Sequence, residues 1–485
     1  MKKSNIQKLF FGIFCFVGIS ANLIGQTKPE KINQLIQAYA DQGKFNGSAL
    51  VSENGSVIFK KGFGQANMEW DIANAPDTKH RLGSITKQFT AALVLQLVEK
   101  GKLDLNAPIS KYLPDYPKAT GDKITLHHLL THTSGVPSYT SFPNFFSETS
   151  RDYYSPKDFV KLFCDLPLEF APGEKFNYSN SGYFLIGYII ETVTGKSYET
   201  CLQENIFTPL QMNDTGFDHH ENILKHRASG YEKKPGGYVN ANYLDMALPY
   251  AAGSMYSTVE DLYRWDQALY KDKVLSAKSR DLMFSKHFPA WGEHYGYGWS
   301  IADIDGFKPN AKINITEHGG GINGFNTIIS RITTDKNLVV LLNNTGSAPL
   351  GKVNEAIRNI LYGKPYEMPK RSIADALLPI IHKSNVADAK AKFIELKKSN
   401  DYALDESEMN RLGYELLSTG KIADAIEIFK LNVESFPKSG NAYDSLGEAY
   451  LKNGNKDLAI ANYKKSIALD PTNENGKKVL AEITK

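Results

Sequence analysis

A serine and a lysine, Ser84 and Lys87, lie three residues apart, so that one turn of helix would place their side chains together. The apolar residues around and after them recur at helical intervals and predict a helix; they are Ile85, Phe89, Leu93, Leu97 and Val98. Ser84 then lies at or near the helix N-terminus, where amide N–H groups and the helix dipole favour negative charge. A hydroxyl held beside an amine in this way can act as a nucleophile without a Ser-His-Asp triad.

Two further motifs, far away in the sequence, carry complementary chemistry. Tyr178-Ser179-Asn180 precedes a predicted helix, and His318-Gly319-Gly320-Gly321 leads into a predicted strand. A phenol can move protons and an amide can donate a hydrogen bond. Glycines let the backbone approach a substrate carbonyl and point an N–H at it. Together with Ser84 and Lys87, these residues would supply a nucleophile, its activator, a proton shuttle and an oxyanion site.

The elements that must position these motifs come from both ends of a long segment. Two β-prone runs meet at Asn54-Gly55, which predicts a hairpin, and further strands are predicted at 324–332 and 337–342. Helices are predicted at 28–43 and 351–362, and the region between about 102 and 290 reads as helices with long loops. A sheet built from both ends with a helical middle is an α+β architecture.

The C-terminal region follows a different pattern, with a period of 34 residues. The recurring residues are Leu412-Gly413-Tyr414, Gly420, Ala425, Phe429 and Pro437, repeated as Leu446-Gly447-Glu448, Gly454, Ala459, Tyr463 and Pro471. This period predicts two tetratricopeptide repeats, with Lys477–Ile483 as a capping helix. Such repeats bind peptides or proteins or serve as a structural cap, and the pattern leaves both roles open.

Composition and the N-terminus restrict the setting. A net charge of +3 over 485 residues, with no long basic block, argues against nucleic-acid binding. Three early lysines precede an apolar run at 9–19, which predicts a signal peptide over 1–26 and a periplasmic or secreted protein. No second apolar span follows, so no stable membrane span is expected after cleavage. Cys164 and Cys201 are expected as separate thiols rather than a disulfide.

The three motifs, in this order, resemble the serine β-lactamase and penicillin-recognising enzymes, in the branch with class C β-lactamases, D,D-peptidases and related esterases. The resemblance covers about 40–362 and is supported by the runs at 129–137, 172–173, 252–258 and 295–299. It implies an antiparallel sheet with an all-helical subdomain. The expected division of the chain is a signal peptide at 1–26, a serine hydrolase domain at 27–363, a linker with a helix at 364–400, and helical repeats at 401–485.

The resemblance also implies a role for each motif residue. Ser84 would be the acylated nucleophile, and Lys87 would help remove its proton. Tyr178 would be the proton shuttle that later activates the deacylating water. Asn180 would hold the substrate's amide or ester side chain and orient Lys87, and the N–H groups of Ser84 and Gly321 would form the oxyanion hole.

One departure from the family pattern bears on the substrate. β-Lactamases of this branch usually carry Lys-Thr-Gly where this chain has His318-Gly319-Gly320. A mostly neutral histidine would attract a substrate carboxylate only weakly. We therefore expect an esterase or D-amino-acid peptidase, acting on a small ester, amide or peptide without a cofactor, rather than an efficient β-lactamase.

Other interpretations are weaker. The chain has no G-x-S-x-G motif, which argues against an α/β-hydrolase despite the His-Gly-Gly-Gly run. Neighbouring histidines at 127–128 and 219–220 would point in different directions, so we expect no metal site. The remaining alternative is a catalytically silent protein on the same fold that binds peptides or proteins through its repeats.

Overall fold

A computed structural model describes residues 25–234 and 237–484 of the chain. The predicted signal peptide therefore lies, apart from its last two residues, outside the described residues. Within them, no helix combines the length and the apolar character needed to cross a membrane.

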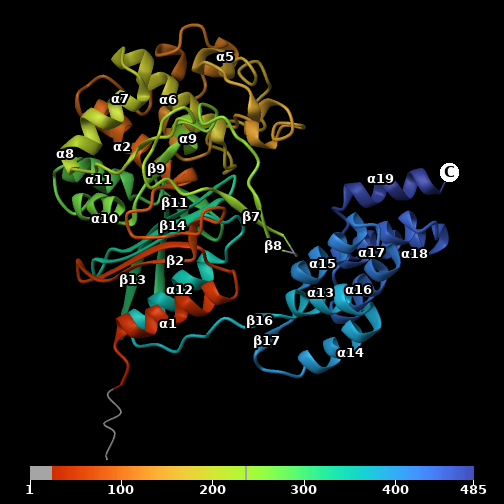
Figure 1. The fold of residues 1–485 in the computed structure, drawn as a ribbon. Helices are drawn as coiled ribbons and strands as arrows, with labels where there is room; N and C mark the ends of the chain where they lie inside the picture. The colour runs from red at the N-terminus through yellow and green to blue at the C-terminus, as the bar shows by residue number, and fades with distance from the viewer. Residues whose placement is uncertain (1–24, 235–236, 485) are drawn as a thin grey trace, which may run out of the picture.

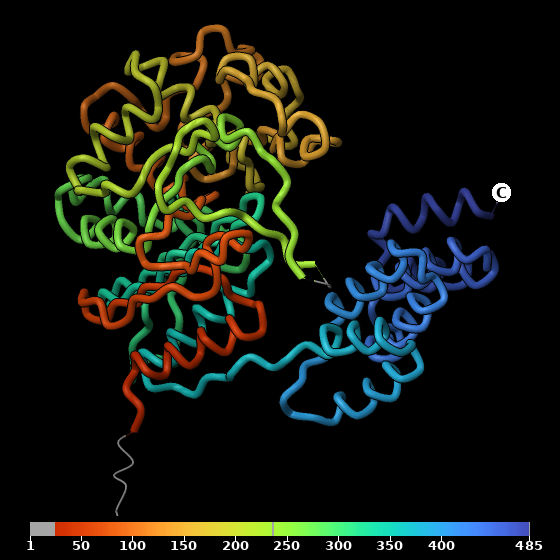
Figure 2. Tube along the Cα trace, in the orientation of Figure 1, coloured from red at the N-terminus to blue at the C-terminus, as the bar shows by residue number. Residues whose placement is uncertain are grey.

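An antiparallel sheet lies at the centre of residues 25–363 and joins strands from both ends of this region (Figure 1). Its strand order is β10-β11-β12-β13-β14-β15-β1-β2, and the N-terminal strand β1 pairs with β15 so that Ala49 lies opposite Leu341. These segments lie side by side as red and teal tubes in Figure 2. The strands are β1 Gly47–Glu53, β2 Ser56–Phe63, β10 Phe288–Ala290, β11 Glu293–Tyr295, β12 Ser300–Lys308, β13 Ala311–Ile322, β14 Phe325–Ile332 and β15 Asn337–Asn343.

Alternation along the central strands builds a hydrophobic core on each face of the sheet. In β1, Leu50 belongs to one core, whereas Ala49 and Val51 belong to the other. The second core is covered by α1 (Lys28–Asp41) and α12 (Leu350–Leu361), both visible on one side of the sheet in Figure 1.

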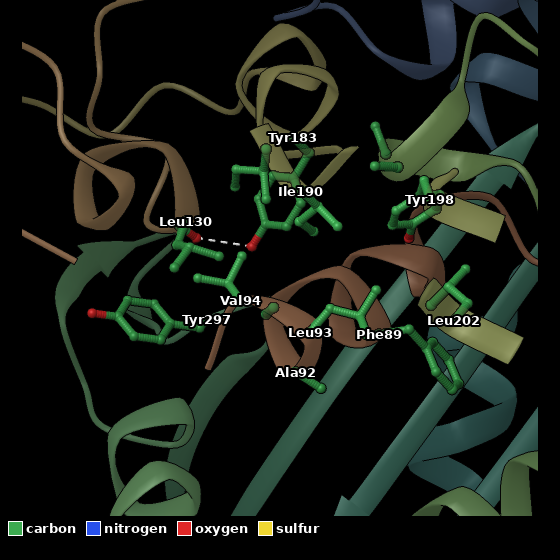
Figure 3. Packing of buried hydrophobic residues seen from close by; sticks show 14 of the residues in the cluster. Phe89, Ala92, Leu93, Val94, Leu130, Tyr183, Ile190, Tyr198, Leu202 and Tyr297 are labelled. Carbon is green, nitrogen blue, oxygen red and sulfur yellow. Dashed lines mark hydrogen bonds between the residues drawn. The ribbon is translucent and has the colours of Figure 1, made fainter. Parts of the chain in front are cut away.

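The helical part covers the other face and is packed around α2 (Thr86–Glu99). Figure 3 shows Phe89, Leu93 and Val94 of this helix among other buried side chains. The Tyr183 hydroxyl, on α6 (Asn180–Thr194), donates to the Leu130 carbonyl at 2.9 Å. The other α-helices here are α3 Lys118–Gly121, α4 Leu126–Leu130, α5 Pro156–Val160, α7 Tyr198–Leu202, α8 Thr208–Leu210, α9 Tyr250–Gly253, α10 Val259–Ala268 and α11 Ala277–Met283.

Short strands and turns connect these helices to the sheet. They are β3 Gln65–Asn67, β4 Ile72–Ala73, β5 His80–Arg81, β6 Gly216–Phe217, β7 Tyr231–Lys234, β8 Gly237–Asn240 and β9 Met255–Ser257, with 3₁₀ turns at Gly83–Ile85 (η1), Ile109–Lys111, Tyr139–Ser141 and Thr149–Arg151 and a π turn at Gln203–Phe207. The predicted α+β architecture, with an antiparallel sheet and a helical subdomain, is confirmed.

The C-terminal region is helical, as predicted, and is drawn in blue in Figures 1 and 2. Its helices are α13 Ile373–Lys383, α14 Val386–Leu396, α15 Glu406–Ser418, α16 Ile422–Ser435, α17 Gly440–Lys452, α18 Lys456–Leu469 and α19 Glu474–Ile483, with β16 (Arg371–Ser372) and β17 (Tyr402–Ala403) forming a short parallel pair. The repeated glycine lets each helix pair pack closely, since a Cβ at Gly413 would lie 2.4 Å from the Phe429 ring.

The segment 364–400 contains two helices, where the sequence predicted a linker with one. Leu377 of α13 and Phe393 of α14 lie in the same hydrophobic cluster as Leu412 and Phe429 of the first repeat. Both helices therefore belong to the packing of the repeats.

Candidate active site

Ser84 lies in the 3₁₀ turn η1, which runs directly into α2. Two glycines allow this turn to press against β13. Gly83 has φ +56°, and a Cβ there would lie 2.9 Å from the Gly321 nitrogen. A Cβ at Gly320 would lie 1.9 Å from the Leu82 carbonyl oxygen. The glycine run therefore brings bare backbone up to the turn that carries Ser84.

Lys87 is fully buried beside the serine. Its Nζ lies 3.1 Å from Ser84 Oγ, 2.8 Å from Asn180 Oδ1 and 2.9 Å from the Ala252 carbonyl oxygen. Burial lowers the pKa of Lys87 well below the ordinary 10.5. A neutral amine has two N–H donors and one lone pair. The Asn180 and Ala252 oxygens are hydrogen-bond acceptors, so each takes one N–H of the amine. The lone pair is then left to face the Ser84 hydroxyl.

Asn180 is held so that its amide oxygen faces Lys87. It begins α6, whose N-cap residue Ser179 accepts from the Gly182 N–H. The Asn180 backbone N–H donates to Ser138 Oγ, and its Nδ2 donates to Thr140 Oγ1, each at 3.1 Å. The side-chain nitrogen is thereby engaged, so the oxygen is free to accept from Lys87.

Tyr178 completes the group around the serine. Its hydroxyl is buried and has no hydrogen-bond partner among the described residues, and Lys87 Nζ lies 4.8 Å from its ring centroid. Burial raises the pKa of Tyr178 well above 10, with the nearby Ser84 hydroxyl opposing the rise. At neutral pH the group is therefore a phenol.

His318 lies beside this group, and its ring nitrogens are both occupied. Nδ1 lies 2.6 Å from the Gly319 carbonyl oxygen, so Nδ1 carries the proton, and Nε2 accepts from the Tyr295 hydroxyl at 2.9 Å. Burial, with a further contribution from Lys87, lowers the pKa of His318 to about 4. The side chain is neutral at physiological pH, which is the property the sequence analysis expected at this position.

Two residues to which the sequence analysis assigned no role support this arrangement. The His132 ring lies 4.1 Å from the Tyr178 ring, centroid to centroid, and its Nδ1 accepts from the Ser179 N–H at 3.1 Å. Its Nε2 lies 3.3 Å from the Tyr295 hydroxyl, which extends the network to His318. Both residues fall in runs that carried the family resemblance, and this was the one signal that pointed to them.

A cavity of about 410 Å³ opens beside this group. Ser84, Asn180 and Gly321 are among its lining residues, so the serine, the amide and the glycine backbone reach the same space. His318, Gly319 and Tyr178 do not line it.

Within the described part of the chain, no group of three or more His, Cys, Asp or Glu residues is placed to hold a metal ion. Cys164 and Cys201 are free thiols.

Comparison with known families matches two parts of the chain. The sequence model described as Beta-lactamase matches residues 32–362, and one described as Tetratricopeptide repeat matches residues 440–473. A putative penicillin-binding protein, PbpX, of Bacillus subtilis is 34% identical over 337 residues, which cover 69% of this chain and 80% of that protein. The teichoic acid D-alanine hydrolase of Staphylococcus aureus is 30% identical over 68% of this chain and 78% of its own length.

Solved structures show the same fold. A penicillin-binding protein from Bacillus halodurans aligns with a TM-score of 0.60 and 29% identity, over 67% of this chain and 99% of its own. A D-amino acid amidase from Ochrobactrum anthropi aligns with a TM-score of 0.58 and 28% identity, over 68% of this chain and 97% of its own.

Proposed function

The chain belongs to the beta-lactamase family and is a serine hydrolase, and from this we propose that it hydrolyses esters or amides of D-amino acids through an acyl-enzyme on Ser84. The observation that carries the proposal is the buried Lys87 amine, 3.1 Å from Ser84 Oγ, with its donors taken by Asn180 and Ala252. This is the geometry of a general base bound to its nucleophile.

Acylation begins with Lys87 Nζ taking the Ser84 proton as Oγ attacks the substrate carbonyl. The N–H groups of Ser84 and Gly321 stabilise the oxyanion, and each such donor typically lowers the barrier by about 2.7–4 kcal/mol. The tetrahedral intermediate collapses when Tyr178 gives its proton to the departing oxygen or nitrogen. This leaves a phenolate beside the Lys87 ammonium.

Deacylation returns both protons. The Tyr178 phenolate takes a proton from the attacking water, and the Lys87 ammonium gives its proton to Ser84 Oγ as the acyl bond breaks. The amine, the phenol and the serine are then restored, and the acid leaves with the water oxygen.

Two observations support the substrate class. The neutral, buried His318 offers no positive charge to a substrate carboxylate, which disfavours efficient penicillin hydrolysis. Two of the similar proteins are described as a D-alanine hydrolase of teichoic acid and a D-amino acid amidase. The proposed substrate is therefore a D-aminoacyl ester or amide that need not carry a carboxylate.

The proposal extends to setting and partner. The N-terminal sequence supports export to the periplasm or the exterior, where a cell-wall D-amino-acid substrate would be present. The tetratricopeptide match at 440–473 supports a peptide or protein partner for the repeats.

Covalent labelling tests the proposal. A fluorophosphonate or a labelled penicillin should add its mass to the peptide that contains Ser84, and Ser84→Ala should abolish the adduct. Well-folded protein that forms no adduct with either probe, and hydrolyses no ester, would favour the silent binding protein instead.

A further inference from the structure

The cavity beside Ser84 contains a carboxylate that the mechanism above does not use. Glu232, on β7, lines this cavity together with apolar side chains that include Phe145, Phe146 and Phe325. Among the described residues that line it, Glu232 is the one Asp, Glu, Lys, Arg or His. The catalytic serine and this negative charge therefore share one otherwise neutral pocket.

The backbone around Glu232 holds its carboxylate in place. The Gly324 N–H, in the turn after β13, donates to Oε1 at 2.9 Å. Oε2 lies over Gly346, where an added Cβ would fall 2.1 Å from it. The strand itself is tied down on that side, because Tyr231 N–H donates to the Asn344 carbonyl at 3.1 Å and Gly346 N–H donates to the Tyr231 carbonyl at 2.9 Å.

No cation of the described chain pairs with this carboxylate. The adjacent Lys233 bonds Asp375 at 3.2 Å instead, and no ion pair within 4.0 Å involves Glu232 in the described residues. A partly buried carboxylate with an amide donor on one oxygen retains acceptor capacity on the other. In a pocket whose other lining side chains are uncharged, a substrate cation is the partner that would satisfy this carboxylate best.

We propose that Glu232 binds the α-ammonium group of the substrate, so that this site selects D-aminoacyl esters or amides with a free amino group. This inference rests on the proposed function and narrows it. The D-aminoacyl group of the substrate would lie between Ser84 and Glu232. Its small apolar side chain would pack against the phenylalanine side chains that line the cavity. An N-acylated or deaminated substrate would leave the carboxylate without its partner.

Two esters that differ in the amino group alone provide the test. Unmodified protein should hydrolyse D-alanine methyl ester with a kcat/KM about 10–100-fold above that for methyl propionate, as expected for a charge-assisted contact. Glu232→Gln should reduce this ratio at least tenfold. Glu232→Lys should shift preference towards monomethyl succinate, a gain that misfolding cannot produce. Glu221→Gln, an exposed carboxylate outside the cavity, is the matched control and should keep the original ratio.

The outcomes separate the two proposals. Equal rates on the two esters in unmodified protein, or an unchanged ratio in Glu232→Gln, would overturn the role of Glu232 and leave the serine hydrolase intact. Failure of a fluorophosphonate to label Ser84 in the same preparations would overturn the proposed function itself.

Discussion

The protonation states of Lys87 and Tyr178 decide which side chain removes the serine proton. Burial lowers the pKa of the amine and raises that of the phenol, which favours the neutral form of each. A neutral amine is a base, whereas a neutral phenol is an acid. The amine also lies within hydrogen-bonding distance of Ser84 Oγ. In the mechanism that we propose, these observations favour Lys87 for the first proton transfer and Tyr178 for protonation of the leaving group.

Buried neutral His318 makes stability depend on pH, and its sign follows from the lowered pKa. The unfolded chain takes up a proton near pH 6.5 and the folded chain only near 4. The contribution of neutral His318 to the free energy of unfolding is therefore fully present above about pH 6.5 and is lost as the pH falls towards 4. This one group would account for up to about 3 kcal/mol.

Urea unfolding at pH 7.5 and pH 4.5 would measure this loss. His318→Asn should reduce the difference between the two pH values, whereas His382→Asn, exposed on α13, should leave it unchanged. An identical pH dependence in the His318 variant and in unmodified protein would mean that His318 is not held neutral.

At this scale, sequence motifs indicated the residues that meet around Ser84 because each motif combines reactive side chains at short range. His132 and Tyr295 were not assigned roles. Their meeting with His318 depends on loop paths that no periodic pattern encodes. Glu232 had no sequence signal, since a single carboxylate in a short strand resembles any solvated one.

At the scale of elements, the contact between η1 and β13 determines where Ser84 lies relative to the glycine backbone. Thr327 Oγ1 donates to the Leu82 carbonyl at 2.7 Å, which adds a hydrogen bond to this contact. Gly320 faces Leu82, whereas a Cβ added at Gly319 would lie 3.7 Å from the Thr327 carbonyl oxygen, an ordinary van der Waals contact. A methyl group in place of the α-hydrogen should therefore be tolerated at Gly319 but not at Gly320.

Gly320→Ala should displace the turn and slow acylation of Ser84 about 100-fold, because a shift of about 1 Å in a reacting group has an effect of that order. Gly319→Ala is the matched control and should stay within about threefold of the unmodified protein. Burst kinetics with p-nitrophenyl acetate would measure both. Equal rates in the two variants would show that this contact does not position Ser84.

Long helices and the main hairpin were predictable because their apolar periodicity or turn residues are local signals. α1 and α12 fall within a few residues of the predicted ranges. The two-residue strands β5 and β6, which pair with β9, were not predicted. Strands this short carry no alternation, so tertiary contacts alone define them.

For the whole molecule, the hydrophobic clusters indicate where the chain divides. The cluster of the repeats begins at Ile373 and shares no residue with the two clusters of the sheet region. The sheet region contacts the C-terminal region through hydrogen bonds and ion pairs. Gln42 Nε2 donates to the Pro369 carbonyl at 2.9 Å, and Lys233 pairs with Asp375 at 3.2 Å. Surface contacts of this kind typically contribute about 0–1 kcal/mol each.

Truncation would test this division. A chain of residues 27–363 should fold and acylate Ser84 within about threefold of the full chain. A chain of 27–400 should be less soluble, because α13 and α14 would expose Leu377 and Phe393, which are now buried. Solubility and fluorophosphonate labelling would compare them. If the 27–363 chain failed to label and the 27–400 chain were soluble and labelled, α13 and α14 would be shown to support the hydrolase part.

The repeats themselves were predictable, since a period of 34 residues is a long-range signal in one dimension. The packing of α13 and α14 against them was not, because these helices lack the repeated residues and join the cluster through ordinary apolar side chains.

The most direct test of the central claim, that a neutral Lys87 activates Ser84, is the pH dependence of the acylation rate. Lys87→Met should lower this rate about 10²–10⁴-fold, and Lys100→Met, exposed at the end of α2, should not. In unmodified protein the single-turnover rate should reach its plateau well below pH 10.5, because burial lowers the pKa of Lys87 well below that value. A rate that instead rises about tenfold per pH unit up to pH 9.5 would contradict the account.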